Sequence, residues 1–221
     1  MTAPGRSGHR RWFVLAASTI VLAMLLGGVV AVWQGRPGRV SAAPQRPSAG
    51  LRAPASFRPG ARPAPGFRLR DLTGSGSVSL SALRGRPVLL TFFDSYCRSL
   101  CPVVGGEIAS AMRRLSARAR PVLVVVSVNP ADTRRSVRAA ARRYRWSSAW
   151  AWHWAAGTHA DLAPVWKSYG IDVRPVAGDI EHSEVVYVID AAGDERAAYM
   201  PPFRGTDLVA DLRTLEQTSG T

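Results

Sequence analysis

Two cysteines, Cys97 and Cys101, are the strongest candidates for chemistry in this 221-residue chain, which contains no others. Pro102 follows them directly, and a segment with apolar residues at helical spacing comes next. Residues four apart share one face of a helix, so both sulfur atoms can point in the same direction. A helix N-terminus also favours thiolate over thiol. The pair can form a local disulfide, act as a redox dithiol or bind a soft ion such as Cu(I), and the spacing alone leaves all three open.

The segments around the cysteines predict the elements that hold them. Residues 87–93 and 121–128 are largely apolar runs of strand length, which is typical of strands buried on both faces of a sheet. Apolar residues recur between the two runs at helical spacing, and arginines gather toward the end of this segment, where the helix dipole favours cations. The sequence therefore predicts a βαβ unit with central parallel strands.

Helix and strand signals alternate through the rest of the chain, so the predicted fold class is α/β. The capping, turn and apolar patterns indicate a helix from Asp132 or Thr133 to about Tyr144, a helix that Thr158 and Asp161 cap and Gly170 ends, a strand over 185–189, a turn over 190–193, a strand over 196–200 and a helix over 206–216.

The N-terminal part of the sequence predicts a membrane anchor. Residues 12–33 carry no charged side chain and have tryptophan at both ends, and a helix of about 20 apolar residues crosses a bilayer. A short tail, residues 1–11, precedes this span, as in a signal anchor. We therefore expect a single-pass protein of the cell membrane, with a cytoplasmic tail and an extracytoplasmic C-terminal domain. Cleavage of the span and export by the twin-arginine route stay open as alternatives.

Between the span and the domain, residues 34–64 are rich in proline and arginine and have neither acidic residues nor a repeating apolar period. Chain of this composition stays extended and does not bury enough surface to fold. We expect an extended linker over 34–64 and a folded domain over 65–221.

The distribution of charge argues against a nucleic-acid partner. The formal net charge is +14, but residues 1–70 hold eleven of the 29 basic residues and no acidic residue. The remaining 18 basic and 15 acidic residues nearly balance. The folded part therefore lacks the strong positive field of a DNA-binding or RNA-binding protein.

Three segments carry a resemblance to a known family: residues 90–102, which end in Cys-Arg-Ser-Leu-Cys-Pro, residues 126–133, and residues 182–193. In this order they are similar to the cysteine loop, a segment after a strand, and the His-Ser strand and turn of the SCO/SenC family, which carries copper to cytochrome oxidase. The likeness extends over about residues 64–216. It implies a thioredoxin-like fold with a central mixed sheet flanked by helices, preceded by one transmembrane helix.

The resemblance also implies a copper site. In such proteins two cysteines and a histidine bind one copper ion, which carries over to Cys97, Cys101 and His182. This set suits Cu(I), and a fourth ligand would admit Cu(II). The implied function is that of a metallochaperone rather than an enzyme. It would take copper from a donor and deliver it to the binuclear copper site of cytochrome c oxidase, with the copper-site subunit as partner.

A thiol-disulfide oxidoreductase is the alternative, in which Cys97 and Cys101 reduce cysteines of the oxidase or of a cytochrome. Such reductases typically have Cys-x-x-Cys and a cis-proline just before the strand that here starts near Val185. This chain has one more residue between its cysteines and no proline over 177–193. A peroxiredoxin has threonine three residues before its reactive cysteine, where this chain has Asp94. These differences favour the metal site.

The sequence departs from the family pattern at three positions. Arg98 and Ser99 occupy the places of an inner proline and an aspartate, and Asn129 replaces a common aspartate. Such positions affect the surroundings of the metal and the docking of partners.

Several other residues have weaker claims to a function. We expect a group of four tryptophans to pack a loop against the sheet rather than to form a partner surface. These are Trp146, Trp150, Trp152 and Trp154. The remaining histidines, His9, His153 and His159, are weaker ligand candidates than His182.

The predicted anchor leads to a direct test by membrane fractionation. We expect the protein to stay in the membrane fraction in both high salt and alkaline carbonate, because residues 12–33 are apolar throughout. Immunoblotting of the fractions measures this. A soluble form that starts near Ala43 would instead show that the span is a cleaved signal.

Overall fold

The computed structural model describes residues 50–218, which fold around an eight-stranded mixed sheet. The predicted tail (1–11), the predicted span (12–33) and residues 34–49 of the predicted linker lie outside the described residues. None of the helices within 50–218 has the length and apolar character needed to cross a membrane.

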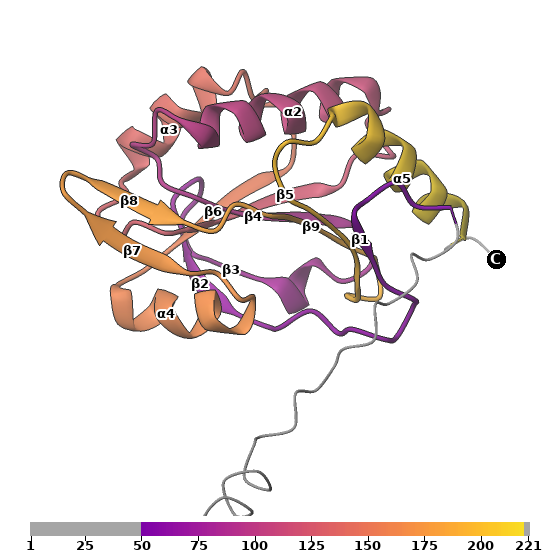
Figure 1. Cartoon of the computed structure of the whole chain (residues 1–221), viewed down its shortest axis with the longest axis horizontal. Helices are drawn as coiled ribbons and strands as arrows, with labels where there is room; N and C mark the ends of the chain where they lie inside the picture. Colours follow the sequence, from indigo (N-terminus) through magenta and orange to yellow (C-terminus); the bar gives the residue numbers. More distant parts are fainter. Residues whose placement is uncertain (1–49, 219–221) are drawn as a thin grey trace, which may run out of the picture. The chain divides into compact units, whose positions relative to one another are not determined.

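The sheet has the strand order β1-β10-β9-β4-β5-β6-β2-β3. Its strands are β1 (Ala55–Ser56), β2 (Arg68–Asp71), β3 (Ser77–Ser79), β4 (Val88–Phe93), β5 (Val122–Ser127), β6 (Trp152–Ala156), β9 (Val186–Ile189) and β10 (Glu195–Tyr199). Strands β4, β5 and β6 run parallel, whereas β9 pairs with β4 in the antiparallel direction (Figure 1). Every residue of β4 and β5 is buried, because these strands lie inside the sheet and are covered on both faces. The predicted βαβ unit is confirmed.

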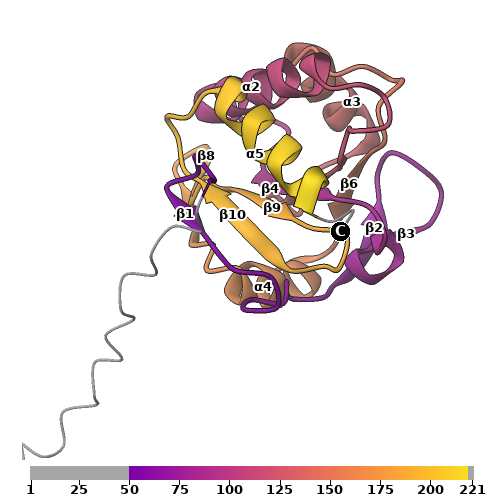
Figure 2. The same ribbon diagram turned by 90° about the vertical axis from the view of Figure 1, so that its right-hand side faces the viewer.

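Helices cover both faces of the sheet. Within the described residues they are α2 (Leu100–Arg114), α3 (Arg134–Arg143), α4 (His159–Ser168) and α5 (Gly205–Thr218), with a short 3-10 helix, η1 (Leu80–Leu83). Helices α2, α3 and α5 lie on one face and α4 lies on the other (Figure 1, Figure 2). Leu89 and Phe93 of β4 accordingly pack into the core under α2, whereas Leu90 and Phe92 pack into the core over α4. The predicted α/β class with a central mixed sheet flanked by helices is confirmed.

Local sequence signals set the ends of two helices as predicted. The Thr133 side chain accepts a hydrogen bond from the backbone N–H of Ser136 at the start of α3. Thr158 does the same with Asp161 at the start of α4. Gly170 follows α4 with a φ of 68°, a conformation that glycine adopts without steric cost.

Strands β7 (Val173–Val176) and β8 (Asp179–His182) form a separate hairpin that projects from one end of the sheet (Figure 1). No apolar alternation predicts this hairpin, because most of its residues are exposed and neither strand has a fully buried face. Gly178 turns the chain between the strands with a φ of 78°. The hairpin positions a functional residue, since its last residue is His182.

The folded domain begins before the predicted boundary at residue 65, so the prediction of an extended linker over all of 34–64 is wrong in its last part. Strand β1 pairs with β10, with Ala55 opposite Ala198. Ala53 and Phe57 are 5% and 9% exposed. An edge strand needs no repeating apolar period, because one row of backbone hydrogen bonds and a few small contacts suffice to hold it.

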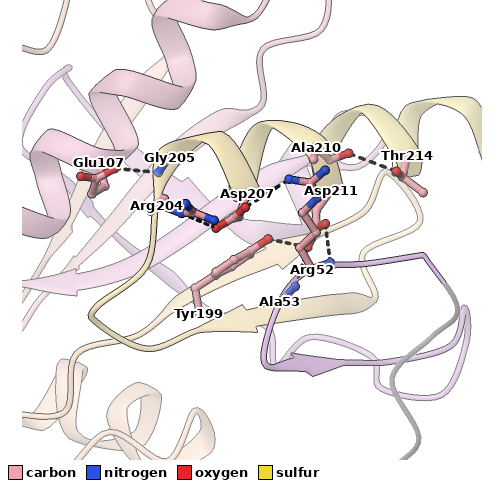
Figure 3. Close-up of polar contacts among 10 residues, drawn as sticks. All are labelled: Arg52, Ala53, Glu107, Tyr199, Arg204, Gly205, Asp207, Ala210, Asp211 and Thr214. Atoms are coloured by element: carbon pink, nitrogen blue, oxygen red, sulfur yellow. Dashed lines mark hydrogen bonds and ion pairs between the residues drawn. The ribbon is translucent and has the colours of Figure 1, made fainter.

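A buried carboxylate on α5 fastens this N-terminal segment to the domain (Figure 3). Asp211 is fully buried and accepts hydrogen bonds from the backbone N–H groups of Arg52 (2.7 Å) and Ala53 (2.9 Å). The hydroxyl of Tyr199 on β10 donates a third, short hydrogen bond to the same carboxylate. The side chain of Asp211 therefore joins three separate segments of the chain.

We expect Asp211→Ala to lower the free energy of unfolding by roughly 2 kcal/mol or more, because it leaves the Tyr199 hydroxyl and two backbone donors without their acceptor. Urea denaturation of the two proteins measures the difference. Asp207→Ala is the matched control, since Asp207 lies on the same helix and pairs only with the exposed guanidinium groups of Arg52 and Arg204. Equal losses in the two variants would contradict the anchoring role of Asp211.

Candidate metal centre

The two cysteines lie where β4 ends and α2 begins, at the carboxyl end of the central parallel strands. Clefts outside this end of a sheet are the usual place for ligand sites in open α/β folds. Cys101 is the second residue of α2 and is fully buried, whereas Cys97 in the preceding loop is half-buried. Both thiols are free. The two sulfurs therefore differ in access to solvent and to a partner.

Asp94 holds the start of the cysteine loop in place. Its buried carboxylate accepts hydrogen bonds from the backbone N–H of Tyr96 (2.9 Å) and from the side-chain amide of Asn129 (3.0 Å), and its carbonyl accepts one from the N–H of Cys97 (3.2 Å). An ionised aspartate at position 129 would repel Asp94 instead of donating to it. This departure from the family pattern thus has a structural reason in the present chain.

A second buried carboxylate, that of Asp132, holds the loop from the other side. It accepts hydrogen bonds from the Ser95 N–H (3.1 Å) and hydroxyl (2.5 Å), from the Trp154 indole (3.0 Å) and from the Ser127 hydroxyl. Burial raises the pKa of Asp132 to about 6. The Arg143 guanidinium also donates to the Ser95 carbonyl at 2.7 Å. The backbone that leads to Cys97 is therefore fixed by a network of satisfied polar groups.

His182 reaches the cysteines from the end of β8. Its Nε2 lies 3.8 Å from the Sγ of Cys101, and its side chain is only 4% exposed. Its Nδ1 lies 3.2 Å from the Ser183 carbonyl, which can only accept a hydrogen bond, so Nδ1 carries the proton and Nε2 directs a lone pair at the sulfur. Burial lowers the pKa of His182, which favours the neutral imidazole that metal ions bind.

The two thiols share hydrogen bonds that make them chemically unequal. A hydrogen bond from Cys101 lowers the pKa of Cys97 to about 5, and the Ser99 hydroxyl, 3.6 Å from its Sγ, adds to this effect. The same bond, together with burial, raises the pKa of Cys101. A serine hydroxyl at position 99 can donate to the Cys97 thiolate, which an ionised aspartate cannot do. Cys97 is thus the thiolate of the pair and Cys101 the thiol.

Glu184 is a residue of the site that the sequence analysis missed. Its side chain is 6% exposed, and its Oε1 lies 3.2 Å from the Cys101 Sγ and 3.4 Å from the His182 Nε2. Burial raises the pKa of Glu184 to about 8. One potential ligand atom from each of Cys101, His182 and Glu184 lies within 4.8 Å of the other two. The signal was an acidic residue directly before the apolar run of β9.

A pocket of about 400 Å³ opens onto this group. Cys97 and Ser99 line it on one side, and the β7–β8 hairpin with Arg174 and Glu181 lines it on the other. Apolar side chains are also exposed around the cysteine loop, namely Tyr96 at 50%, Leu100 at 40% and Val103 at 59%. The half-buried Cys97 therefore lies at the bottom of an open, partly apolar surface.

A family model described as SCO1/SenC matches residues 58–217. This chain belongs to the SCO1/SenC family. The match covers both cysteines, His182 and Glu184 within one continuous segment. A comparison with curated proteins finds no match.

Solved structures of low sequence identity share the fold of this SCO1/SenC chain. ScoI from Bradyrhizobium japonicum, solved with copper bound, is 23% identical with a TM-score of 0.59, over 69% of this chain and 98% of that one. A SCO1/SenC family lipoprotein from Bacillus anthracis is 20% identical with a TM-score of 0.64, over 73% and 99% of the two chains. BsSco, described as a member of the Sco family of cytochrome c oxidase assembly proteins with a disulfide switch, is 20% identical with a TM-score of 0.60, over 71% and 94%.

The other candidates from the sequence have structural roles or lie elsewhere. Trp146, Trp150 and Trp154 are buried and Trp152 packs against them, so the predicted aromatic packing in this SCO1/SenC chain is confirmed. The Nδ1 of His153 pairs with Asp71 at 2.7 Å on β2, His159 packs edge-on against Trp166, and His9 lies outside the described residues.

The lowered pKa of Cys97 predicts its reactivity. We expect alkylation of Cys97 by iodoacetamide to rise with a midpoint near pH 5, because the thiolate is the nucleophile and is present above that pH. Peptide mass spectrometry across a pH series measures this rate. In Cys101→Ala the midpoint should move toward the ordinary value of about 8.5, whereas Cys101→Ser, which keeps a donor, should retain a low midpoint. An unchanged midpoint in Cys101→Ala would contradict the assigned hydrogen bond.

Proposed function

We propose that this protein is a copper metallochaperone that binds one copper ion through Cys97, Cys101 and His182. In this proposal it delivers the ion to the binuclear copper site of cytochrome c oxidase, outside the cytoplasm. One observation carries the proposal. The Sγ of Cys101 and the Nε2 of His182 approach to 3.8 Å although 81 positions separate them in the sequence, and Cys97 is hydrogen-bonded to Cys101. Membership of the SCO1/SenC family and the copper-bound structure of ScoI support the choice of metal.

The donor atoms fit a copper ion by their chemistry. Two sulfurs and one imidazole nitrogen form a soft, low-coordinate set of the kind that selects Cu(I) over harder ions. Cys97 is ready as a thiolate, His182 is neutral, and the Cys101 thiol gives up its proton when a metal ion binds. The Ser183 carbonyl orients the His182 ring through its Nδ1, as such carbonyl groups do for metal-binding histidines.

The surroundings of Cys97 suit transfer of the ion to a partner. Cys97 faces the open pocket, and Tyr96, Leu100 and Val103 expose apolar surface around it. A partner protein can cover this surface and offer its own ligands to the ion. The partners in this proposal are a copper donor and the copper-site subunit of the oxidase. An anchor formed by residues 12–33 would hold the domain at the extracytoplasmic side of the cell membrane.

A thiol-disulfide oxidoreductase is the second candidate, favoured by the inequality of the two thiols. The accessible Cys97 thiolate would attack a partner disulfide, form a mixed disulfide and release one partner thiolate. The Cys101 sulfur, after losing its proton, would then attack Cys97 and release the second partner thiolate. The partner gains two electrons and a Cys97–Cys101 disulfide remains. The disulfide switch described for BsSco is consistent with such chemistry.

One variant separates the two candidates, because an imidazole is a metal ligand but has no part in dithiol exchange. In His182→Ala we expect copper affinity to fall at least ~10-fold, the lower limit for losing even an outer partner of a metal ligand. The Cys97–Cys101 disulfide should still form. Anaerobic Cu(I) titration against a chromophoric chelator, and thiol trapping after oxidation, measure the two properties on the full-length protein.

Cells that carry His182→Ala should also assemble less active oxidase. His159→Ala is the matched control, since this exposed histidine lies on α4 and should leave copper binding unchanged. Wild-type copper affinity together with active oxidase in the His182→Ala cells would remove the metal-site assignment and leave the oxidoreductase.

A further inference from the structure

Glu184 is a buried carboxylate that the rest of the domain does not explain. Its side chain is 6% exposed, and its Oε2 has no hydrogen-bond partner within residues 50–218. No lysine or arginine of the described chain forms an ion pair with it, and its histidine neighbour, His182, is held neutral by burial. A buried carboxylate without a compensating partner opposes folding. Such a group persists where it has a task that the isolated domain does not show.

The backbone on both sides of Glu184 is fixed, so the direction of its side chain is set by the fold. The Thr91 hydroxyl on β4 donates to the carbonyl of Val185 at 2.9 Å. On the other side, the N–H of Ser183 donates to the Asp172 carbonyl at 3.0 Å, and the Ser183 hydroxyl accepts from the Asp172 N–H at 3.2 Å. Glu184 is therefore held in position before any ligand arrives.

The Oε1 of Glu184 faces the same space as the two ligand atoms nearest to it. It lies 3.2 Å from the Cys101 Sγ and 3.4 Å from the His182 Nε2, and the three atoms lie within 4.8 Å of one another. A metal ion bonded to sulfur at about 2.3 Å and to nitrogen or oxygen at about 2.0 Å fits between atoms at such separations. An ion held by Cys101 and His182 would thus lie within reach of this oxygen.

The carboxylate changes which oxidation state the site prefers. A carboxylate oxygen is a harder ligand than sulfur or imidazole, and a four-ligand N,O,S,S set admits Cu(II), whereas two sulfurs and one nitrogen suffice for Cu(I). Charge acts in the same direction. Two thiolates and one carboxylate leave a smaller net negative charge around a divalent ion than around a monovalent one, and a buried net charge is unfavourable.

We propose that Glu184 is a fourth, oxygen ligand of the copper site and selects the divalent state. This inference rests on the proposed copper site but goes beyond it, because Cys97, Cys101 and His182 suffice for Cu(I). The chain would then hold copper in both oxidation states, with Glu184 contributing chiefly to the affinity for Cu(II).

The test compares Glu184→Gln with Glu181→Gln in the full-length protein. Glu181 lines the same pocket, but it is exposed and pairs with Arg174 at 3.6 Å, so its substitution removes the same charge without removing a ligand. Cu(II) is added to the reduced protein and followed by electron paramagnetic resonance and chelator competition. Cu(I) affinity is measured anaerobically. In Glu184→Gln we expect Cu(II) affinity to fall at least ~10-fold and the Cu(II) spectrum to change, while Cu(I) affinity stays unchanged. Glu181→Gln should behave as wild type in both measurements.

Two results would overturn the assignment of Glu184 and leave the proposed function standing. One is a wild-type Cu(II) spectrum and affinity in Glu184→Gln, and the other is an equal loss of Cu(I) and Cu(II), which would indicate a role in positioning His182 alone. A wild-type protein that binds neither ion would overturn the proposed copper site itself. Glu184→Gln removes a buried carboxylate with an unpartnered oxygen and should fold. If it does not, Glu184→Asp, which withdraws the carboxylate by one methylene group, should lose Cu(II) affinity and keep Cu(I) affinity.

Discussion

The antiparallel pairing of β4 with β9 is the constraint on which the site depends. Thr91 of β4 lies opposite Val186 of β9, so the end of β4 that leads to Cys97 is beside the start of β9, which Glu184 directly precedes. The hydroxyl of Thr91 reinforces this contact by donating to the Val185 carbonyl. A slip of one residue would turn every side chain of the strand to the opposite face. Because β4 is buried on both faces, core packing fixes the register and with it the approach of the two halves of the site.

Three buried acidic residues lie near this end of the sheet, and their hydrogen bonds separate their tasks. Asp94 and Asp132 accept several hydrogen bonds each and hold the loop before Cys97 in one conformation. Glu184 contacts only Cys101 and His182 and keeps one oxygen without a partner within residues 50–218. A fully satisfied buried carboxylate makes a loop rigid, whereas an unsatisfied one is a cost that a bound cation can offset. The first two residues therefore build the site, and the third belongs to its chemistry.

The inequality of the two thiols serves metal binding and disulfide exchange alike. Cys97 is accessible and acidic, so it is the sulfur that an incoming partner meets first in either reaction. Cys101 is buried behind it, where it can complete a metal site or close a disulfide. The residues that distinguish the two functions are those with no part in sulfur exchange, His182 and Glu184. Transfer of copper and control of the thiol oxidation state are therefore linked through the same pair of atoms, because a disulfide has no thiolate left to bind a metal ion.

Local sequence determined most of the fold. The apolar runs of β4 and β5, the capping residues Thr133 and Thr158, and the turn at Gly193 each act within a few residues of chain, so their elements could be predicted. The β7–β8 hairpin and β1 could not, because neither buries a face that would impose a period on the sequence. Their positions depend on partners far along the chain, such as Ala198 for Ala55.

The site divides in the same way. The spacing of Cys97 and Cys101 alone established that two sulfurs share one side of a helix start, and a family resemblance added His182. The tertiary structure alone decided that Cys101 is buried while Cys97 is accessible, that Ser99 and Asn129 act as donors where the family pattern has carboxylates, and that Glu184 joins the site. The physical reason is that burial and hydrogen bonding set the charge and direction of each side chain. Both depend on strand pairing between segments about 80 positions apart, which no local pattern in the sequence records.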